Sequence, residues 1–255
     1  MNFSKNIKMN LKTADGQFRG KKETFIADEV RKQLIGQADP IYREFQSSLV
    51  PGMGTMMGVR VPVLRTIAKE TAKTDYEGFV EKSDVTVYEE LMIRGMMIGY
   101  RHSSIEEYQR ELDCFVPLIN NWAICDCCCS TYHFMKKNQD VWYSYLEKWL
   151  KSDREYEVRF AVVCLLDYFI KDCYIDRILS ILSSVQQGDY YAKMSVAWAV
   201  SVCYVRYPEK TEKLFREERL DDFTHNKAIQ KIRESNRVSK EEKKRVNTWK
   251  RKGES

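Results

Sequence analysis

Amphipathic segments recur along this chain at a nearly constant spacing. Long helices are predicted to begin about 32 to 35 residues apart, each followed by a shorter amphipathic segment, and their starts lie near Thr86, Leu118, Arg154, Asp189 and Leu220. A fixed period of this length is typical of helix pairs that stack on one another. The sequence therefore predicts an all-α chain folded as a curved solenoid, with the longer helices lining its concave surface.

Local signals set the ends of several of these helices. Aspartate is a favoured N-terminal cap, and we predict caps at Asp153, Asp189 and Asp222. Pro208 is expected to begin a second helix directly after Tyr207. Prolines and glycines crowd residues 49–63, which predicts a loop followed by a helix that starts near Pro62. This loop would separate an N-terminal pair of helices from the repeats.

The composition narrows the class of protein. With 255 residues, 44% of them hydrophobic, the chain has enough apolar surface for one large domain that spans residues 1–255. Only 5 prolines and 11 glycines interrupt it, which favours helix. No apolar run is long enough to cross a membrane, and residues 1–22 lack the apolar centre of a secretory signal. We therefore expect a cytoplasmic protein that does not bind membranes.

Positive charge is concentrated at the two ends of the chain. The formal net charge is only +5, but residues 1–22 hold six Lys or Arg and one acidic residue, and residues 225–252 hold eleven and three. A basic N-terminal segment and a basic C-terminal helix and tail, 225–255, predict binding to a polyanion. Nucleic acid is favoured over a membrane because no strong apolar face accompanies the C-terminal run. For each run alone, a solvated helix or tail is the alternative.

Eight cysteines raise the question of a metal site. Four of them cluster as Cys125, Cys127, Cys128 and Cys129, whereas the other four are scattered singly at Cys114, Cys164, Cys173 and Cys203. A structural zinc site usually needs two separate ligand pairs, which this pattern lacks. We therefore predict no metal site and expect reduced cysteines that pack as small apolar side chains.

Trp122 and Asp126 are four residues apart in a stretch predicted to be helical. At that spacing the indole ring and the carboxylate lie one above the other on one helix face. That face also carries Cys125, Cys129 and His133. The opposite face carries the residues expected in the core, which are Ile124, Cys127, Cys128, Thr131, Phe134 and Met135. A carboxylate beside an indole, in a chain rich in Lys and Arg, favours a site for a cationic or electron-poor ligand.

Residues on the next two long helices are placed to join this pair. Arg159 and Trp198 are predicted at similar depths along their helices, and equivalent positions of neighbouring repeats lie side by side in a solenoid. The face of Arg159 is otherwise apolar and carries Val162, Val163, Leu166 and Ile170. An arginine on such a face requires a partner, and Asp126 and a phosphate group are the two candidates.

Together these features resemble the AlkD family of DNA alkylation repair proteins, which are alkylpurine glycosylases built from HEAT-like helical repeats. The similarity covers most of the chain and implies an ARM/HEAT-type superhelix. The motifs that carry it are Gly58-Val-Arg-Val-Pro-Val-Leu-Arg65, Trp122-x3-Asp126, Glu157-Val-Arg-Phe-Ala161, Lys193-x4-Trp198 and Thr224-His-Asn-Lys-Ala-Ile-Gln-Lys-Ile-Arg-Glu-Ser235. Their order and spacing, rather than any single motif, carry the resemblance.

The resemblance implies hydrolysis of the N-glycosidic bond of cationic N3- or N7-alkylated purines in duplex DNA. Asp126 would orient a water molecule and offset the positive charge that develops on the sugar. Trp122 and Trp198 would hold the deoxyribose and backbone through their ring faces. Arg159 would contact a phosphate and help to position Asp126. The resemblance also implies no metal, no nucleotide cofactor and no closed pocket for the base.

Further side chains are candidate DNA contacts because of their charge or ring surface. They are Lys193, Tyr190, Tyr191, Arg206, Lys227, Lys231 and Arg237. The chain departs from the family pattern in its cysteine-rich segment and at Ser201, where family enzymes often have an arginine. At Ser201, one phosphate contact is therefore either missing or supplied by Lys193 or Arg206. The expected partner is duplex DNA with alkylated bases, bound by a monomer.

A different class of function stays open on the residues alone. Asp126 can be a purely structural partner of Arg159, and Trp198 can be a core residue. His133 shares the predicted face of Asp126, but a single histidine on a helix is usually packed or solvated, so we place it outside the site. The alternative function is a non-catalytic scaffold that binds distorted or branched nucleic acid, or a protein, on its concave face.

Overall fold

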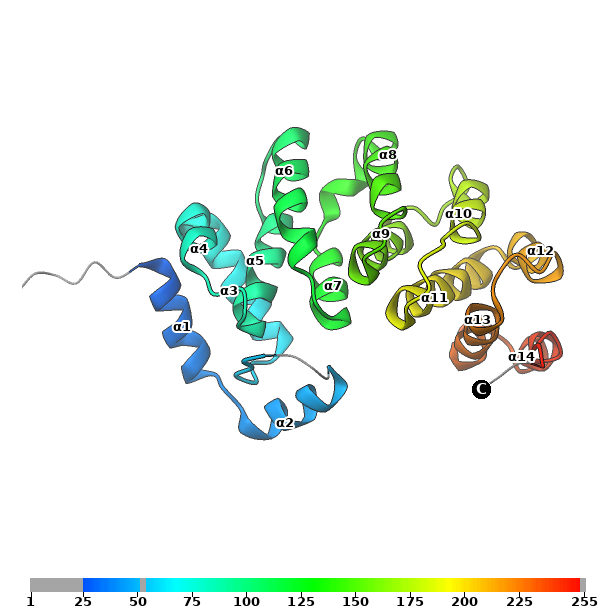
Figure 1. Ribbon diagram of the computed structural model, residues 1–255, viewed down its shortest axis with the longest axis horizontal. Helices are drawn as coiled ribbons and strands as arrows, with labels where there is room; N and C mark the ends of the chain where they lie inside the picture. Colours follow the sequence, from blue (N-terminus) through cyan, green and yellow to red (C-terminus); the bar gives the residue numbers. More distant parts are fainter. Residues whose placement is uncertain (1–24, 51–53, 253–255) are drawn as a thin grey trace, which may run out of the picture.

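The computed structural model describes residues 25–50 and 54–252 (Figure 1). In these residues the chain forms fourteen α-helices, two short 3-10 helices and no strand. The α-helices are α1 (Ile26–Gly36), α2 (Pro40–Leu49), α3 (Val61–Thr74), α4 (Tyr76–Lys82), α5 (Tyr88–Tyr100), α6 (Ile105–Phe115), α7 (Trp122–Cys129), α8 (Gln139–Trp149), α9 (Glu155–Tyr168), α10 (Ile175–Leu182), α11 (Tyr190–Arg206), α12 (Pro208–Arg216), α13 (Asp222–Glu234) and α14 (Lys240–Asn247). The 3-10 helices are η1 (Val116–Leu118) and η2 (His133–Lys136). The predicted basic segment 1–22 lies outside the described residues.

The helices stack in two curved layers. The inner layer is α3, α5, α7, α9, α11 and α13, each packed against the next, and the even-numbered helices from α4 to α12 cover its outer side (Figure 1). The inner helices from α5 to α13 begin 32 to 35 residues apart, each within four residues of its predicted start. This confirms the predicted all-α solenoid. One detail of the prediction is wrong, because α7 is shorter than α8, which follows it.

The predicted helix starts are mostly correct to within one or two residues. Helix α12 begins at Pro208 as predicted, and α3 begins one residue before Pro62. The predicted aspartate caps are less accurate. Arg154 rather than Asp153 occupies the cap of α9, where the Ser152 hydroxyl accepts the Arg154 N–H at 3.0 Å. Asp189 occupies the cap of α11 as predicted, but its carboxylate accepts a hydrogen bond from the Gln187 side chain at 3.0 Å and none from the first turn of the helix. Helix α13 is capped by Asp221 instead of Asp222.

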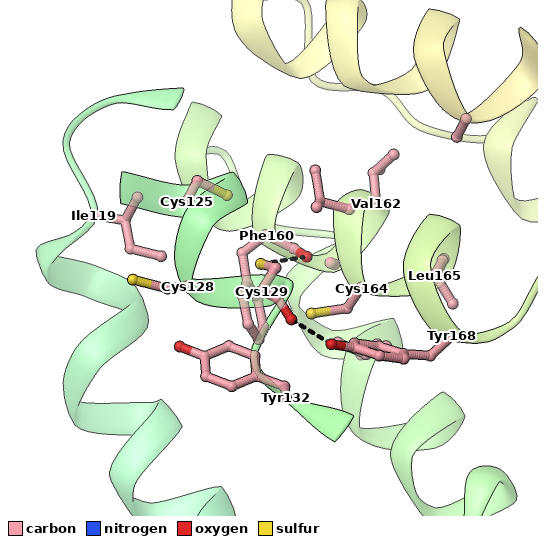
Figure 2. Packing of buried hydrophobic residues seen from close by; sticks show 14 of the residues in the cluster. Ile119, Cys125, Cys128, Cys129, Tyr132, Phe160, Val162, Cys164, Leu165 and Tyr168 are labelled. Atoms are coloured by element: carbon pink, nitrogen blue, oxygen red, sulfur yellow. Dashed lines mark hydrogen bonds between the residues drawn. The ribbon is translucent and has the colours of Figure 1, made fainter. Parts of the chain in front are cut away.

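A continuous apolar core fills the space between the two layers, and cysteines contribute to it. Figure 2 shows Cys125, Cys128, Cys129 and Cys164 among the packed side chains of α7 and α9. Burial raises the pKa of each of these thiols, so they remain protonated and unreactive. The prediction of small core side chains is confirmed for these four and for Cys203; the exposed cysteines are Cys114 and Cys173. Residues 25–50 and 54–252 hold no group of three or more His, Cys, Asp or Glu placed to bind a metal ion.

A buried carboxylate fixes the loop that leads into the repeats. Glu89, in the first turn of α5, is fully buried and accepts hydrogen bonds from the backbone N–H groups of Met57, Gly58 and Val59 at 2.8 to 3.2 Å. Gly58 has a φ of 88°, and a Cβ there would lie 2.4 Å from the Asp39 carbonyl oxygen. The glycine is therefore required for the close passage of α2 and the loop.

The described part of the basic C-terminal run, residues 225–252, is largely helical. These residues form most of α13 and then a separate helix, α14. The segment after α14 is pinned back to α13, because His225 Nε2 lies 2.8 Å from the Trp249 carbonyl and Arg251 pairs with Asp222 at 2.8 Å. No helix in the described part of the chain has both the length and the apolar composition needed to cross a membrane.

Candidate functional site

Helix α7 places Trp122 and Asp126 on the inner layer. The Asn121 side chain caps it by accepting the Ile124 N–H at 3.0 Å, so that Trp122 is its first residue and Asp126 lies one turn later. The helix ends at Cys129. The hydroxyl groups of the next two residues, Ser130 and Thr131, donate to carbonyl groups of the last turn, which ends the helix there.

This early end corrects part of the sequence prediction. A single helix from Trp122 to Met135 was expected, with His133 on the same face as Asp126. His133 instead begins the separate 3-10 helix η2 and packs edge-on against Tyr168 at a ring distance of 6.1 Å. The shared face therefore stops after the residues of α7.

Asp126 and Arg159 form a two-pronged ion pair between α7 and α9. Arg159 Nε donates to Asp126 Oδ1 at 2.9 Å, and Nη2 donates to Oδ2 at 2.8 Å. The third nitrogen, Nη1, donates to the Tyr191 carbonyl at the start of α11, at 2.9 Å. Of the two partners that the sequence left open for Arg159, the structure selects Asp126. The arginine thereby links three successive inner helices at one point.

The two members of this pair differ in exposure. The Arg159 side chain is 7% exposed, and the Asp126 side chain is 19% exposed. Burial alone would lower the pKa of Arg159, but the bonds to Asp126 outweigh it and the pKa is raised, so the guanidinium stays charged. A guanidinium this deeply covered presents little surface to a phosphate. The carboxylate, in contrast, keeps an edge open to the surface.

The two tryptophans lie on either side of the ion pair and have different surroundings. Trp122 is half-buried, and its Nε1 donates to the Leu49 carbonyl at the end of α2, at 3.0 Å. Trp198, also half-buried, lines a groove of about 310 Å³ between α11 and the end of α13. Asp126 and Arg159 are each the fifth residue of their helix, whereas Trp198 is the ninth of α11. The predicted similar depth therefore holds for the ion pair but not for Trp198.

Two of the predicted DNA contacts lie in the groove beside Trp198. Lys231 from α13 and Arg237 from the segment after it line this groove, together with Ser201 from α11. Ser201 donates its hydroxyl proton to the Trp198 carbonyl at 2.7 Å. The groove therefore combines an indole ring with two positive charges and with one negative charge, that of Glu234 at the end of α13.

The other predicted DNA contacts lie apart from this groove. Tyr190, 53% exposed, and Tyr191 belong to a row of rings at the N-terminal ends of α9, α11 and α13, where Tyr191 stacks on Tyr156 at 5.7 Å. The basic residues of this edge are already engaged: Lys193 pairs with Asp221 at 3.2 Å, and Lys227 lies 5.7 Å from the Phe223 ring. Arg206, at the opposite end of α11, donates to the Ile170 carbonyl at 2.8 Å.

Sequence analysis gave no role to Arg65, which the fold brings to the end of α7. Its Nη2 donates to the Ser130 hydroxyl at 2.8 Å. Burial lowers the pKa of His133, and the positive charges of Lys136 and Arg65 lower it further. Arg65 closes the motif that begins at Gly58, one turn into α3. Its place one turn after a proline-marked helix start was the available signal, but its neighbour on α7 is set by packing.

The comparison with known families covers most of the chain. A model of the family described as "DNA alkylation repair enzyme" matches residues 30–232, which include the ion pair, both tryptophans and Lys231. No curated protein matches the chain at a significant level. Because the family match spans well over half of the sequence, the chain belongs to the DNA alkylation repair enzyme family.

Proposed function

We propose that this protein is a DNA glycosylase that hydrolyses the N-glycosidic bond of cationic N3- or N7-alkylated purines in duplex DNA. The family supports an enzyme of DNA repair. The observation that carries the proposal is the partly open carboxylate of Asp126, which Arg159 holds in a fixed orientation on the inner layer. A fixed negative charge of this kind suits a reaction in which positive charge develops on a sugar.

The proposed chemistry needs little more than this charge and one water molecule. A positively charged purine is already a good leaving group, so the C1′–N bond breaks with an oxocarbenium-like sugar. Asp126 uses one lone pair on each oxygen for Arg159 and retains others to accept a proton from the attacking water. Arg159 then acts as a positioning residue, since its third donor is fixed on the Tyr191 carbonyl.

The tryptophans and the groove would hold the DNA. Trp122, whose Nε1 is bonded to the Leu49 carbonyl, would offer a ring face beside Asp126, and Trp198 would offer a second one across α9. Ring faces attract the partial positive charge of the reacting sugar. Lys231 and Arg237 would bind phosphate groups of the DNA backbone next to the lesion. In this proposal the protein acts as a cytoplasmic monomer on DNA with alkylated bases, without a metal or nucleotide cofactor.

The experiment is the release of free base from alkylated duplex DNA by the native chain and by Asp126→Asn at the same salt concentration. The proposal expects release by the native chain, loss of release in the variant, and similar DNA binding by both. Equal release by both proteins would remove Asp126 from the reaction.

One observation favours a second candidate function, a scaffold that binds distorted or branched nucleic acid. Both oxygens of Asp126 are already engaged by Arg159, as a purely structural ion pair would require. The same experiment separates the two candidates. No release by the native chain, with binding to branched or distorted DNA retained, would support the scaffold.

A further inference from the structure

A cavity of about 610 Å³ lies apart from the candidate active site. It is lined by the turn between α5 and α6, by η2 and by the first residues of α8. Neither Asp126 nor Arg159 nor either of the candidate tryptophans contributes to it. A cavity of this volume is large enough for a small organic ligand.

Two polar side chains of the cavity have no structural partner that would explain them. The Ser103 hydroxyl oxygen is buried and forms no hydrogen bond with any group of residues 25–50 and 54–252. Asn138 stands at the cap of α8 with a φ of 49°, yet its side chain accepts no N–H from the first turn of that helix. A polar group without a partner gains free energy when a ligand supplies one. These two side chains therefore suit a ligand that forms hydrogen bonds.

The lining of the cavity also favours negative charge. His102, His133 and Lys137 all line it, and Lys137 forms no ion pair within the described part of the chain. Partial burial lowers the pKa of His133, and the positive charges of Lys136 and Arg65 lower it further. Surroundings that oppose a proton on a histidine through nearby cations attract an anion.

The other charged residues of the lining are already engaged. Arg101 donates to Glu111 at 2.6 Å, and Glu107 accepts the backbone N–H of Ser104, the cap of α6, at 2.9 Å. Glu107 is the one carboxylate among the described residues that line the cavity, and it is committed to its own helix. The positive charge of Lys137 is therefore not offset from within the cavity.

An aromatic wall borders the same space. Phe134 stacks on Tyr108 with ring centroids 3.8 Å apart, and Trp142 packs against Phe134 at 5.0 Å. Tyr108 and Trp142 are buried, whereas Phe134 is only half-buried. Two buried rings thus hold the Phe134 ring in place and leave part of its surface for a planar ligand.

The hydrogen-bonding groups, the charge and the ring together match a nucleotide. A phosphate monoester offers negative charge and three acceptor oxygens, which suit Lys137, the Ser103 hydroxyl and the Asn138 amide. We propose that this cavity binds a nucleotide with a terminal phosphate monoester, whose base packs on Phe134. A free mononucleotide and the 5′-phosphorylated end of a DNA strand share this chemistry. The inference goes beyond the proposed function and does not rest on it, since the nucleotide is a ligand at a separate site and no cofactor of base release.

The test is calorimetric titration of the full chain with adenosine monophosphate, adenosine and inorganic phosphate. We expect adenosine monophosphate to bind, and each of the other two to bind at least about tenfold more weakly, because each lacks either the phosphate or the base. The affinity for adenosine monophosphate should fall about tenfold in Lys137→Gln, which loses a charge-assisted contact. A severalfold loss is expected in Asn138→Gly, which removes the amide but keeps a residue that tolerates the positive φ.

The matched control is Lys151→Gln, which removes an exposed lysine that follows α8 and does not line the cavity. It should bind adenosine monophosphate with native affinity, and so should Asp126→Asn. Equal losses in Lys137→Gln and Lys151→Gln, or loss of binding in Asp126→Asn, would place the nucleotide elsewhere and overturn the proposal. Absence of binding by the native chain at about 5 mM adenosine monophosphate, or equal affinity for inorganic phosphate, would overturn it as well.

Competition identifies the source of the phosphate. A 5′-phosphorylated single strand that displaces adenosine monophosphate better than the same strand without its phosphate would assign the cavity to a strand end. If both strands fail to displace adenosine monophosphate, the ligand is a free nucleotide. Neither result depends on base release, so failure of the proposed glycosylase activity and failure of this inference are separate outcomes.

Discussion

Two carboxylates near the start of inner helices are each held by several nitrogen donors, yet they differ in access to solvent. Glu89 on α5 is fully buried and takes three backbone N–H groups from one loop. Asp126 on α7 is held by the guanidinium of Arg159 and remains 19% exposed. The partners of Glu89 shield its carboxylate from solvent completely, whereas Arg159 orients the carboxylate of Asp126 and leaves part of it exposed.

Access to solvent therefore distinguishes a structural carboxylate from a candidate functional one in this fold. A buried acid with all its lone pairs facing protein donors has no capacity left for a ligand. An acid with one edge open keeps that capacity, and a fixed partner reduces the reorganisation needed in a reaction. Replacing Glu89 should lower the free energy of unfolding without changing the rate of base release. Replacing Asp126 should reduce the rate of base release more than the free energy of unfolding.

The largest stability effect is expected for Glu89→Gln. The substitution removes the charge and turns an amide donor toward backbone N–H groups, so we expect a loss of about 3 kcal/mol in the free energy of unfolding. Urea denaturation measures this loss. Base release per folded molecule should stay near the native value, and a stable but inactive variant would contradict the structural role of Glu89.

A smaller effect on stability, joined to an effect on activity, is expected for Arg159→Lys. Lysine keeps the charge but donates to one carboxylate oxygen and cannot also reach the Tyr191 carbonyl, so we expect a loss of about 2 kcal/mol. Base release should fall because Asp126 is less firmly oriented. If Arg159→Lys had the native free energy of unfolding and the native rate of base release, the double hydrogen bond between Arg159 and Asp126 would matter for neither.

Binding rather than stability should change when the groove beside Trp198 loses its charges. We expect the pair of substitutions Lys231→Gln and Arg237→Gln to weaken duplex binding by about tenfold, roughly 1.4 kcal/mol, at moderate salt. The slope of log affinity against log salt should decrease by about two. Lys148→Gln on the outer helix α8 is the matched control. An unchanged slope would show that phosphates do not reach the groove.

The smallest effect is expected for Trp122→Phe. Phenylalanine keeps an aromatic ring but loses the hydrogen bond from Nε1 to the Leu49 carbonyl, which is worth about 1 kcal/mol. Circular dichroism melting measures the stability, and single-turnover kinetics measure base release. A larger drop in rate than in stability would place the orientation of this ring in the reaction. Equally small decreases in the rate and in the stability would limit the role of Trp122 to its hydrogen bond with the end of α2.

Much of the fold was predictable because a repeat period fixes many helices at once. The starts of α9 and α11 were predicted within one residue, and Pro208 marked α12 correctly. The end of α7 was missed because the segment after Cys129 contains no glycine or proline. The helix stops instead because Ser130 and Thr131 bond to its last carbonyl groups, a choice that depends on their rotamers.

The sequence indicated which residues belong to the candidate site, but not which of them form hydrogen bonds with one another. Arg159 on an apolar face indicated a partner, yet only packing selects Asp126 and the Tyr191 carbonyl. The bond from Trp122 to Leu49 joins residues 73 positions apart and depends on where α2 folds back.

The most direct test of the account is single-turnover release of 7-methylguanine from duplex DNA by the native chain, Asp126→Asn and Glu89→Gln, all at a temperature where each protein is folded. The account predicts release by the native chain, release slower by about a hundredfold or more in Asp126→Asn, and near-native release in Glu89→Gln. Native release in Asp126→Asn, or no release by any of the three proteins, would contradict the claim that the open carboxylate of α7 is the reactive one.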